Sequence, residues 1–144
     1  MNKVALKQTK VSDCIIIDIP KIEDVRGKLA VVENGLLPFK MKRVYYLFDI
    51  PAGAYRGGHA HIKEQGFLIA MSGSFEVVLK DGFDEKKILL NRPDQGLLIP
   101  SGIWRELQGF SQGSIGVVVN SDEFDESDYI RDYQTFLRYK RQNQ

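Results

Sequence analysis

The feature that most constrains the fold is a regular alternation of short β-forming runs and turn residues. Runs rich in Val, Ile, Leu, Phe and Tyr are separated by Pro, Asn-Gly, Ser-Gly and Asp-Gly signals at a spacing of roughly ten residues. The alternation predicts about nine or ten strands, and the best defined are Cys14–Ile19, Lys28–Glu33, Arg43–Ile50, Phe67–Met71, Ser74–Lys80, Lys86–Asn91, Gln95–Ile99, Trp104–Gln108 and Ile115–Asn120. No helical period lies between them, so we expect an all-β antiparallel barrel or sandwich.

Only the carboxyl end of the chain has a helical period. We expect Ser127 to cap a helix, because apolar residues recur behind it at steps of three and four, namely Tyr129, Ile130, Tyr133, Phe136 and Leu137. The aromatic pattern predicts that this helix docks on the barrel. The acidic run Asp122–Asp128 lacks the glycine-centred pattern of a calcium loop, and we expect it to be solvated charge where the helix begins.

Composition narrows the class of protein. The chain has 144 residues, of which 43% are hydrophobic and 27% charged, and we expect one domain over residues 1–144. A formal charge of +1 gives no reason to expect nucleic acid or an anionic membrane as a partner. No apolar run approaches the length of a membrane span, and residues 1–10 lack a signal-peptide core. The only cysteine, Cys14, excludes an internal disulfide. We therefore expect a cytoplasmic protein.

Both histidines of the chain lie in the stretch Arg56-Gly57-Gly58-His59-Ala60-His61. On an extended segment, residues two apart point to the same side, so the two imidazoles would lie together. Arg56 and the two glycines leave an uncrowded, cationic approach to them. Such a pair binds a metal, transfers protons or has a purely structural role, and its spacing alone does not decide among these.

Two motifs resemble the cupin superfamily, whose members are jelly-roll barrels: Gly53-x5-His59-x-His61 and Pro100-x-Gly102. A metal-binding cupin adds a glutamate after the histidine pair and a histidine after the second glycine, but the corresponding residues here are Gln65 and Arg105. Arginine stays protonated, has no lone pair to donate and repels a cation. Two imidazoles alone fall short of the three protein ligands of a catalytic zinc site. We therefore expect no metal ligands.

Within the cupins, the chain is similar to the dTDP-4-keto-6-deoxyglucose 3,4-ketoisomerase family over nearly its whole length. The strings that carry this resemblance are Lys42-Arg43-Val44-Tyr45-Tyr46, the stretch from Arg56 to His61, Pro100-Ser-Gly-Ile-Trp104-Arg105-Glu106, and the segment from Ser121 to Tyr133. The resemblance implies a cupin-like jelly roll and an enzyme that moves a carbonyl from C4 to C3 of a thymidine-diphosphate-linked deoxyhexose. It also implies a supply of deoxyaminosugar precursors for a surface glycan. No cofactor is required, because no redox equivalent leaves the sugar.

The resemblance assigns roles to individual residues. His59 and His61 would be the proton-handling pair, because histidine accepts and returns protons near neutrality. Tyr45 and Tyr46 lie on one strand, so only one of them can face the interior, and we expect Tyr46 to do so and to supply a phenolic proton. The expected substrate-binding residues are Arg26, Lys28, Arg56, Arg105 and Trp104, although a place in the core or the wall is the favoured interpretation of Trp104.

Several points stay open at this level. A nucleotide-sugar 3,5-epimerase and a non-catalytic sugar-nucleotide-binding cupin are the alternative functions, and a metal-dependent cupin enzyme is a third. The sequence does not say which histidine serves carbon and which serves oxygen, and Arg105 favours a gluco configuration at C4 of the product only slightly. Arg43 and Arg131 are expected to pair with surface carboxylates. A homodimer is expected, since pairing hides exposed strand edges, and exchange of an N-terminal strand is one way to form it.

Overall fold

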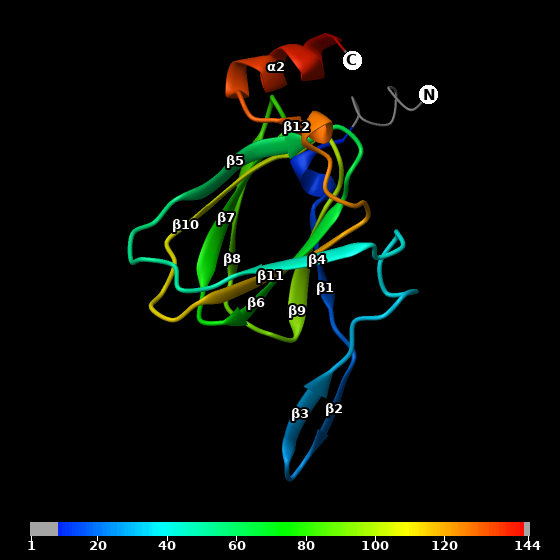
Figure 1. Ribbon diagram of the computed structural model, residues 1–144, viewed down its shortest axis with the longest axis vertical. Coiled ribbons are helices and arrows are strands. Elements are labelled where there is room, and N and C mark those ends of the chain that lie inside the picture. Colours follow the sequence, from blue (N-terminus) through cyan, green and yellow to red (C-terminus); the bar gives the residue numbers. More distant parts are fainter. Residues whose placement is uncertain (1–8, 143–144) are drawn as a thin grey trace.

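Two antiparallel sheets that face each other form the body of the protein in the computed structural model, which describes residues 9–142 (Figure 1). The first sheet has the order β1-β9-β6-β11-β4, and the second has the order β12-β5-β10-β7-β8. The strands are β1 (Ile15–Asp18), β2 (Lys21–Asp24), β3 (Gly27–Ala30), β4 (Arg43–Leu47), β5 (Arg56–His61), β6 (Gly66–Ser72), β7 (Phe75–Lys80), β8 (Glu85–Leu90), β9 (Gln95–Ile99), β10 (Trp104–Gln108), β11 (Ile115–Asn120) and β12 (Tyr129–Ile130). The predicted jelly-roll fold is confirmed.

The core lies between the two sheets, where alternate residues of each strand meet. Phe75, Val77 and Leu79 of β7 are fully buried there, opposite Leu97 and Ile99 of β9. Period-two alternation of this kind is what the sequence pattern predicts for strands with one buried face. The remaining strands leave the interior wide enough at one end for a cavity, described below.

One predicted strand differs in its extent. The predicted run Lys28–Glu33 is replaced by a separate two-stranded hairpin of β2 and β3, joined by a turn at Val25 and Arg26. This hairpin projects away from the barrel (Figure 1), and all of its residues are exposed. It presents apolar side chains to solvent, with Ile22 at 65% and Leu29 at 58% exposure. A hairpin of this kind has no core of its own, so the rest of this chain does little to stabilise it.

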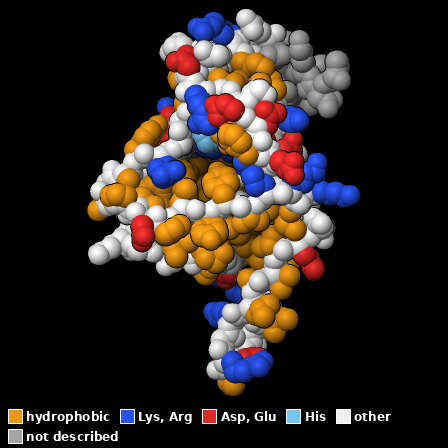
Figure 2. Space-filling model, in the orientation of Figure 1, with side chains coloured by type: hydrophobic (Ala, Val, Ile, Leu, Met, Phe, Trp, Pro, Cys, Tyr) orange, Lys and Arg blue, Asp and Glu red, His pale blue; other side chains and the backbone are white. Residues whose placement is uncertain are grey.

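The outer face of the first sheet is also apolar. The segment between β3 and β4 covers part of it, because Leu37, Phe39 and Met41 pack against Phe67 and Ile69. Beyond this cover, other hydrophobic side chains of this face remain exposed, among them Ile15, Val44, Tyr46 and Met71. Figure 2 shows hydrophobic side chains gathered across this part of the molecule.

The carboxyl end differs from the predicted helix in where it begins. Residues Glu126–Asp128 form a 3-10 turn (η2), Tyr129–Ile130 pair with β5 as β12, and helix α2 spans Tyr133–Gln142. Asp132 accepts a hydrogen bond from the Thr135 amide and caps α2, so the prediction that Ser127 caps the helix is wrong. Ser127 instead donates to Asp125. A second 3-10 turn, η1, covers Val11–Asp13.

Helix α2 packs against the outer side of the second sheet, as its aromatic pattern predicts. Phe136 is fully buried and lies against Trp104, with ring centroids 5.7 Å apart. Lys140 is buried as well, and its ammonium donates to the carbonyl oxygens of Thr9 and Gly102. Within residues 9–142, no helix has the length and apolar character needed to span a membrane.

Candidate active site

A cavity of about 380 Å³ opens between the two sheets, and four arginines contribute to its walls: Arg43, Arg56, Arg105 and Arg131. Imidazole and phenol groups of His59, Tyr45 and Tyr129 complete its polar lining. Figure 2 shows the hollow, with a histidine side chain at its floor and cationic side chains around it. A cavity with this much fixed positive charge is suited to a ligand that carries negative charge.

The pairing of β5 with β10 turns the key side chains inward. Arg105 lies directly opposite His59 in the antiparallel ladder, and the register shifts at the next residue, which is a β-bulge. Gly57 allows this approach, since its φ is +100° and an added Cβ would lie 3.1 Å from the backbone oxygen of Arg105. Only glycine fits such a backbone at such a distance. The glycines before the histidine pair thus bring strand β5 against β10.

His59 presents an unpaired nitrogen at the cavity. Its Nε2 is buried and makes no hydrogen bond within the described residues. Burial and, to a smaller extent, the nearby charges of Arg105 and Arg131 lower the pKa of His59 to about 3, although a hydrogen bond with the Gly57 backbone opposes the shift. The imidazole is therefore neutral and offers a lone pair to a reacting hydrogen.

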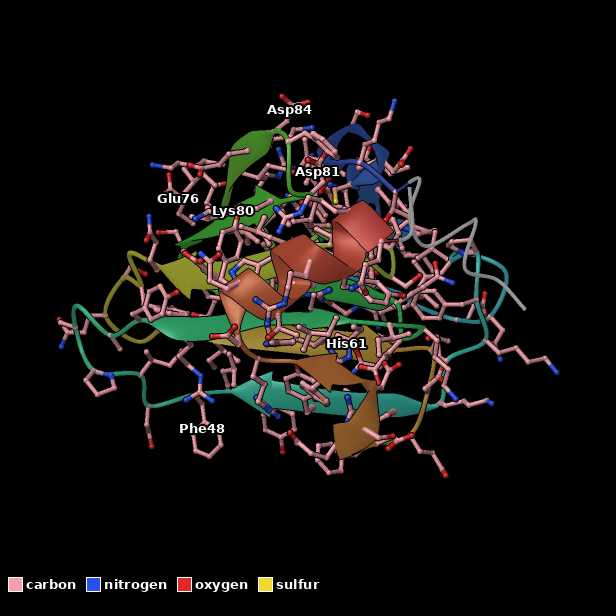
Figure 3. The ribbon with its side chains drawn as sticks, turned by 90° about the horizontal axis from the view of Figure 1, so that it is seen from above. Phe48, His61, Glu76, Lys80, Asp81 and Asp84 are labelled. Carbon is pink, nitrogen blue, oxygen red and sulfur yellow. The ribbon has the colours of Figure 1, made fainter. Side chains whose placement is uncertain are left out.

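His61 lies deeper and is held by carboxylates. Its side chain is 3% exposed, and Nδ1 lies 3.2 Å from Oδ2 of Asp128. On the other edge of the ring, Nε2 lies 3.7 Å from Oε2 of Glu64, beyond hydrogen-bonding distance. Burial lowers the pKa of His61, as do the positive charges of nearby arginines. Figure 3, viewed from above, shows His61 beneath the C-terminal segment that supplies Asp128.

Aromatic rings fix the two imidazoles against each other. The centroids of His59 and His61 are 4.9 Å apart with the planes at 87°, and the Tyr129 ring lies 5.1 Å from the first and 4.3 Å from the second. Arg131 covers the other side of Tyr129 at 4.2 Å. The predicted histidine pair therefore does come together in the interior, and a third ring packs against both.

Arg105 is a buried cation without an acidic partner. It is 8% exposed, no carboxylate within the described part of the chain lies within ion-pair distance, and its Nε makes no hydrogen bond there. One terminal nitrogen donates to the Ile103 carbonyl oxygen at 3.1 Å. Burial of an unpaired charge is costly, and burial accordingly lowers the pKa of Arg105. Such a group is poised to receive an anionic or developing negative oxygen.

The tyrosine prediction is wrong in its choice of residue. Tyr46 is 62% exposed on the outer face of β4, whereas Tyr45 lines the cavity. Val118 of β11 pairs with Tyr45 and Val117 with Tyr46, and this register places the odd-numbered residues of β4 inward. Burial raises the pKa of Tyr45, so its phenol keeps its hydrogen. Figure 3 shows that Phe48, which follows β4 with the same parity as Tyr46, lies at the periphery.

Three predicted substrate-binding residues lie away from the cavity. Trp104 precedes Arg105 on β10, so it points to the opposite face, where α2 covers it. Arg26 and Lys28 sit on the projecting hairpin and pair there with Asp24 and Glu23. Within this chain, none of these three residues lines the cavity, and their role in substrate binding stays a prediction. Arg56 and Arg105 do line it, as predicted.

Arg43 and Glu64 form an interior ion pair that was not expected. Arg43 donates to Glu64 at 2.9 Å, and the Glu64 side chain is only 3% exposed, so Arg43 does not pair with a surface carboxylate. With its amide oriented to satisfy both groups, Asn120 donates to Glu64 and accepts from Arg43. Burial raises the pKa of Glu64, and the charge of Arg43 opposes that shift. Arg131 does bind a surface carboxylate as predicted, Glu126 at 2.7 Å.

The donor set beside His61 does not fit a metal ion. His61, Glu64 and Asp128 could each offer one ligand atom, and these atoms lie within 4.8 Å of one another. However, Glu64 is paired with Arg43, and Asp128 already accepts from the backbone amides of Lys63 and Glu64. A cation there would also face the positive charge of Arg43. Hydrogen bonding accounts for the arrangement of these groups.

Besides Arg43 and Arg131, sequence reasoning missed Glu64, Asp128 and Tyr129. Asp128 is 5% exposed, which contradicts the expectation that the acidic run is solvated charge at the start of a helix. Asp128 and Tyr129 belong to a string that carried the family resemblance, and this was the signal that could have found them. Glu64 lies three residues after His61, one position earlier than the cupin spacing requires, and therefore escaped notice.

Comparisons with known proteins agree with this geometry. The model of the family FdtA, described as WxcM-like, C-terminal, matches residues 12–141. The TDP-4-oxo-6-deoxy-alpha-D-glucose-3,4-oxoisomerase of Aneurinibacillus thermoaerophilus is 42% identical over 125 residues, which cover 86% of this chain and 90% of that protein.

Solved structures of ketoisomerases are also similar. A 3,4-ketoisomerase from Helicobacter canadensis has a TM-score of 0.87 at 44% identity, over 90% of this chain and 98% of its own. The sugar 3,4-ketoisomerase QdtA from Thermoanaerobacterium thermosaccharolyticum, solved with TDP, has a TM-score of 0.89 at 35% identity, over 92% of this chain and 98% of its own. A dTDP-6-deoxy-D-glucose-3,5-epimerase from Legionella pneumophila shares only the fold, at 14% identity and a TM-score of 0.72. The predicted resemblance is thus confirmed, and the chain belongs to the FdtA family, among relatives that are sugar 3,4-ketoisomerases.

Proposed function

We propose that the protein is a 3,4-ketoisomerase of a thymidine-diphosphate-linked 4-keto-6-deoxyglucose, which it converts into the 3-keto sugar through an enediol. The observation that carries this proposal is the pairing of His59 with Arg105 on neighbouring strands. A neutral imidazole nitrogen and a cation without an acidic partner face the same cavity. A base beside a charge stabiliser is what removal of a hydrogen next to a ketone requires.

The reaction can be balanced with these groups. A neutral imidazole takes the hydrogen from C3, the C3–H electron pair forms the C3–C4 double bond, and the C4 oxygen becomes an enediolate oxygen beside a guanidinium. A proton then passes between the two oxygens, and the imidazolium returns a proton to C4, which leaves the carbonyl at C3. No electron leaves the sugar. His59 and His61 supply the proton-handling groups, and Tyr45 takes the phenolic role first expected of Tyr46.

The lowered pKa of His59 is compatible with this role. Burial is its largest cause, and the charges of Arg105 and Arg131 are the next. The negative charge of a bound diphosphate would offset the contribution of the arginines, though not that of burial.

The anionic end of the substrate has two candidate partners at the cavity wall, Arg56 and Arg131. Arg56 has no carboxylate within ion-pair distance in the described residues, whereas Arg131 is paired with Glu126 and stacked on Tyr129. Guanidinium groups match diphosphate oxygens in geometry and charge. The solved relative that contains TDP, and a variant of the same enzyme solved with TDP-4-keto-6-deoxyglucose, support a ligand of this class.

We also propose a homodimer that uses the projecting hairpin. The exposed apolar side chains of Ile22, Val25 and Leu29 have no cover in this chain and would gain it by packing on a second copy. Exchange of the hairpin would carry Arg26 and Lys28 away from their own barrel and toward the partner. Light scattering is expected to give twice the chain mass of 16.4 kDa, and a monomer at micromolar concentration would contradict this arrangement. A cytoplasmic role in surface-glycan precursor supply belongs to the same proposal and rests on family resemblance.

The deciding experiment is incubation of the 4-keto substrate in deuterated water, followed by proton NMR of the product sugar. Ketoisomerisation gives the 3-keto sugar without deuterium at C5, and with deuterium at C4 only to the extent that the imidazolium exchanges its hydrogen with solvent, whereas 3,5-epimerisation places deuterium at C3 and C5. The same spectrum gives the configuration at C4, gluco or galacto. His59→Asn is expected to abolish turnover while nucleotide affinity stays within about threefold, because the substitution removes the base but not the arginines.

Each alternative has its own outcome in this experiment. Label at C5 would identify an epimerase, and nucleotide binding by the unaltered protein without any turnover would identify a binding protein. Arg138→Met serves as the control variant, because Arg138 is exposed on α2 and should leave turnover unchanged.

A further inference from the structure

The carboxylate of Asp128 is fixed from several sides, although it belongs to an otherwise exposed acidic segment. Its two oxygens accept hydrogen bonds from the backbone amides of Lys63 and Glu64, at 2.8 and 3.1 Å. The backbone carbonyl oxygen of the same residue accepts from the Ile62 amide. The turn that follows β5 therefore surrounds this carboxylate. Its Oδ2 also lies next to Nδ1 of His61.

We propose that Asp128 is a positioning residue that holds His61 in the tautomer with hydrogen on Nδ1, so that Nε2 carries the lone pair. This inference rests on the proposed ketoisomerase function, in which His61 handles protons. Asp128 does not itself touch the reacting sugar; it acts through the imidazole.

The hydrogen-bond pattern fixes the tautomer. An ionised carboxylate only accepts hydrogen bonds, so the imidazole nitrogen 3.2 Å away must donate. Burial raises the pKa of Asp128, but the two backbone amides favour its ionised form and oppose that shift. Burial also disfavours a second hydrogen on His61, whose pKa is lowered. A neutral ring with its hydrogen on Nδ1 has its lone pair on Nε2.

The second nitrogen is free to act because nothing in the described structure occupies it at hydrogen-bonding distance. The nearest carboxylate oxygen, on Glu64, is 3.7 Å from Nε2 and is held by Arg43. The rings of His59 and Tyr129 prevent the imidazole from turning over, since both pack against it at 4.9 and 4.3 Å. Without Asp128 the ring would keep its place but lose the preference for one tautomer.

The Asp128→Asn substitution tests this inference, because the amide keeps the size of the side chain and reverses its polarity toward the ring. Its oxygen can still accept from the Lys63 amide, while its NH2 group, in the place of Oδ2, loses the hydrogen bond from the Glu64 amide, donates to Nδ1 and moves the ring hydrogen to Nε2. We expect kcat to fall by about 100-fold or more, as in other enzymes whose histidine is forced into the wrong tautomer. KM should stay within about threefold, since the arginines of the cavity are untouched.

Nitrogen NMR reads the tautomer directly. The chain has two histidines, so a sample labelled with ¹⁵N-histidine gives two imidazoles, and the His59→Asn variant identifies which signals belong to His61. The unaltered protein should show a protonated Nδ1 and a pyridine-like Nε2 for His61, and Asp128→Asn should exchange the two signals. Asp128→Glu, which retains an acceptor, should recover part of kcat and the original tautomer.

Asp125→Asn is the matched control. Asp125 lies in the same segment and caps the turn at Ser127, but it is exposed and does not reach an imidazole. It should change neither the tautomer nor kcat. An equal loss of kcat in this variant would mean that the segment, and not the Asp128 carboxylate, is what matters, and would overturn the inference.

Two further outcomes would overturn the inference and leave the proposed function standing. One is a His61 ring that carries its hydrogen on Nε2 in the unaltered protein, a measurement that does not depend on any variant folding. The other is an Asp128→Asn protein with exchanged nitrogen signals and kcat within threefold of the unaltered enzyme. Deuterium at C5 of the product, or nucleotide binding without turnover by the unaltered protein, would instead overturn the proposed function itself.

Discussion

Replacement of Arg105 by methionine should make the protein more stable and less active. The guanidinium is 8% exposed, and no carboxylate of the described residues compensates its charge. An uncompensated buried charge costs several kcal/mol, and apolar replacements of buried ions are often stabilising by about 1–4 kcal/mol. Loss of the hydrogen bond to the Ile103 carbonyl oxygen lowers this added stability by about 1 kcal/mol. The net expectation is about 1–3 kcal/mol of added stability, since methionine keeps an apolar stem against the apolar wall formed by Leu68 and Ile99.

Thermal unfolding and steady-state kinetics measure the two effects separately. For a chain of 144 residues, about 1–3 kcal/mol corresponds to a rise in Tm of roughly 3–10 °C. Loss of one charge-stabilising group should lower kcat by about 100- to 1,000-fold. Arg138→Met on the exposed side of α2 should change Tm by no more than about 2 °C and leave kcat unaltered. A Tm that drops in Arg105→Met would show that the guanidinium stabilises the fold, and would refute the reasoning.

Three other perturbations follow from the structure. The pKa of His59 is about 3 in the folded chain and near 6.5 in the unfolded chain, so the unfolded state binds more protons between these pH values. The free energy of unfolding should therefore fall as the pH drops from 6.5 toward 3. Urea titrations should find a shallower decline with pH in His59→Asn, and an unchanged decline would contradict the lowered pKa. Lys140→Met should cost about 2–4 kcal/mol in the same assay, since it removes the ammonium that donates to the buried Gly102 carbonyl oxygen and to the Thr9 carbonyl oxygen, and a cost below 1 kcal/mol would count against that role. Gly57→Ala should lower both Tm and kcat, because the added Cβ would lie 3.1 Å from backbone atoms of β10 and the φ of this residue is +100°. Retention of both Tm and kcat would mean that the backbone at the β-bulge can relax.

The sequence predicts the layers of this fold well because strand periodicity is a local signal. Runs such as Ser74–Lys80 and Gln95–Ile99 show their burial pattern directly and correspond to β7 and β9. The family and the ketoisomerase class were also predicted from short strings, and the comparisons confirm both. Proximity of His59 to His61 follows from the same period-two rule and is seen in the structure.

What local reasoning could not supply is the phase of a strand and the contacts between distant segments. Alternation says that only one of Tyr45 and Tyr46 faces inward, but the choice is made by register with β11, more than 70 residues away. For the same reason, Trp104 and Arg105 were both predicted to bind substrate, although neighbouring residues of a strand point to opposite faces. Asp128 looked like one solvated acid among several, because its partner His61 is 67 positions earlier in the chain. Tyr129 lies on β12 but was predicted to be helical, because the spacing of the apolar residues that follow it also fits a helix.

The late position of β12 has a consequence for how the enzyme is made. The imidazoles on β5 emerge from the ribosome first, and the codon for Asp128 is read 67 residues after that of His61. At roughly 5–20 residues per second, a nascent chain waits about 3–13 seconds between the two. A chain released in this interval would contain both histidines but would lack Asp128 and Tyr129, whose side chains lie beside them. Activity therefore requires that translation continue at least as far as Asp128 and Tyr129.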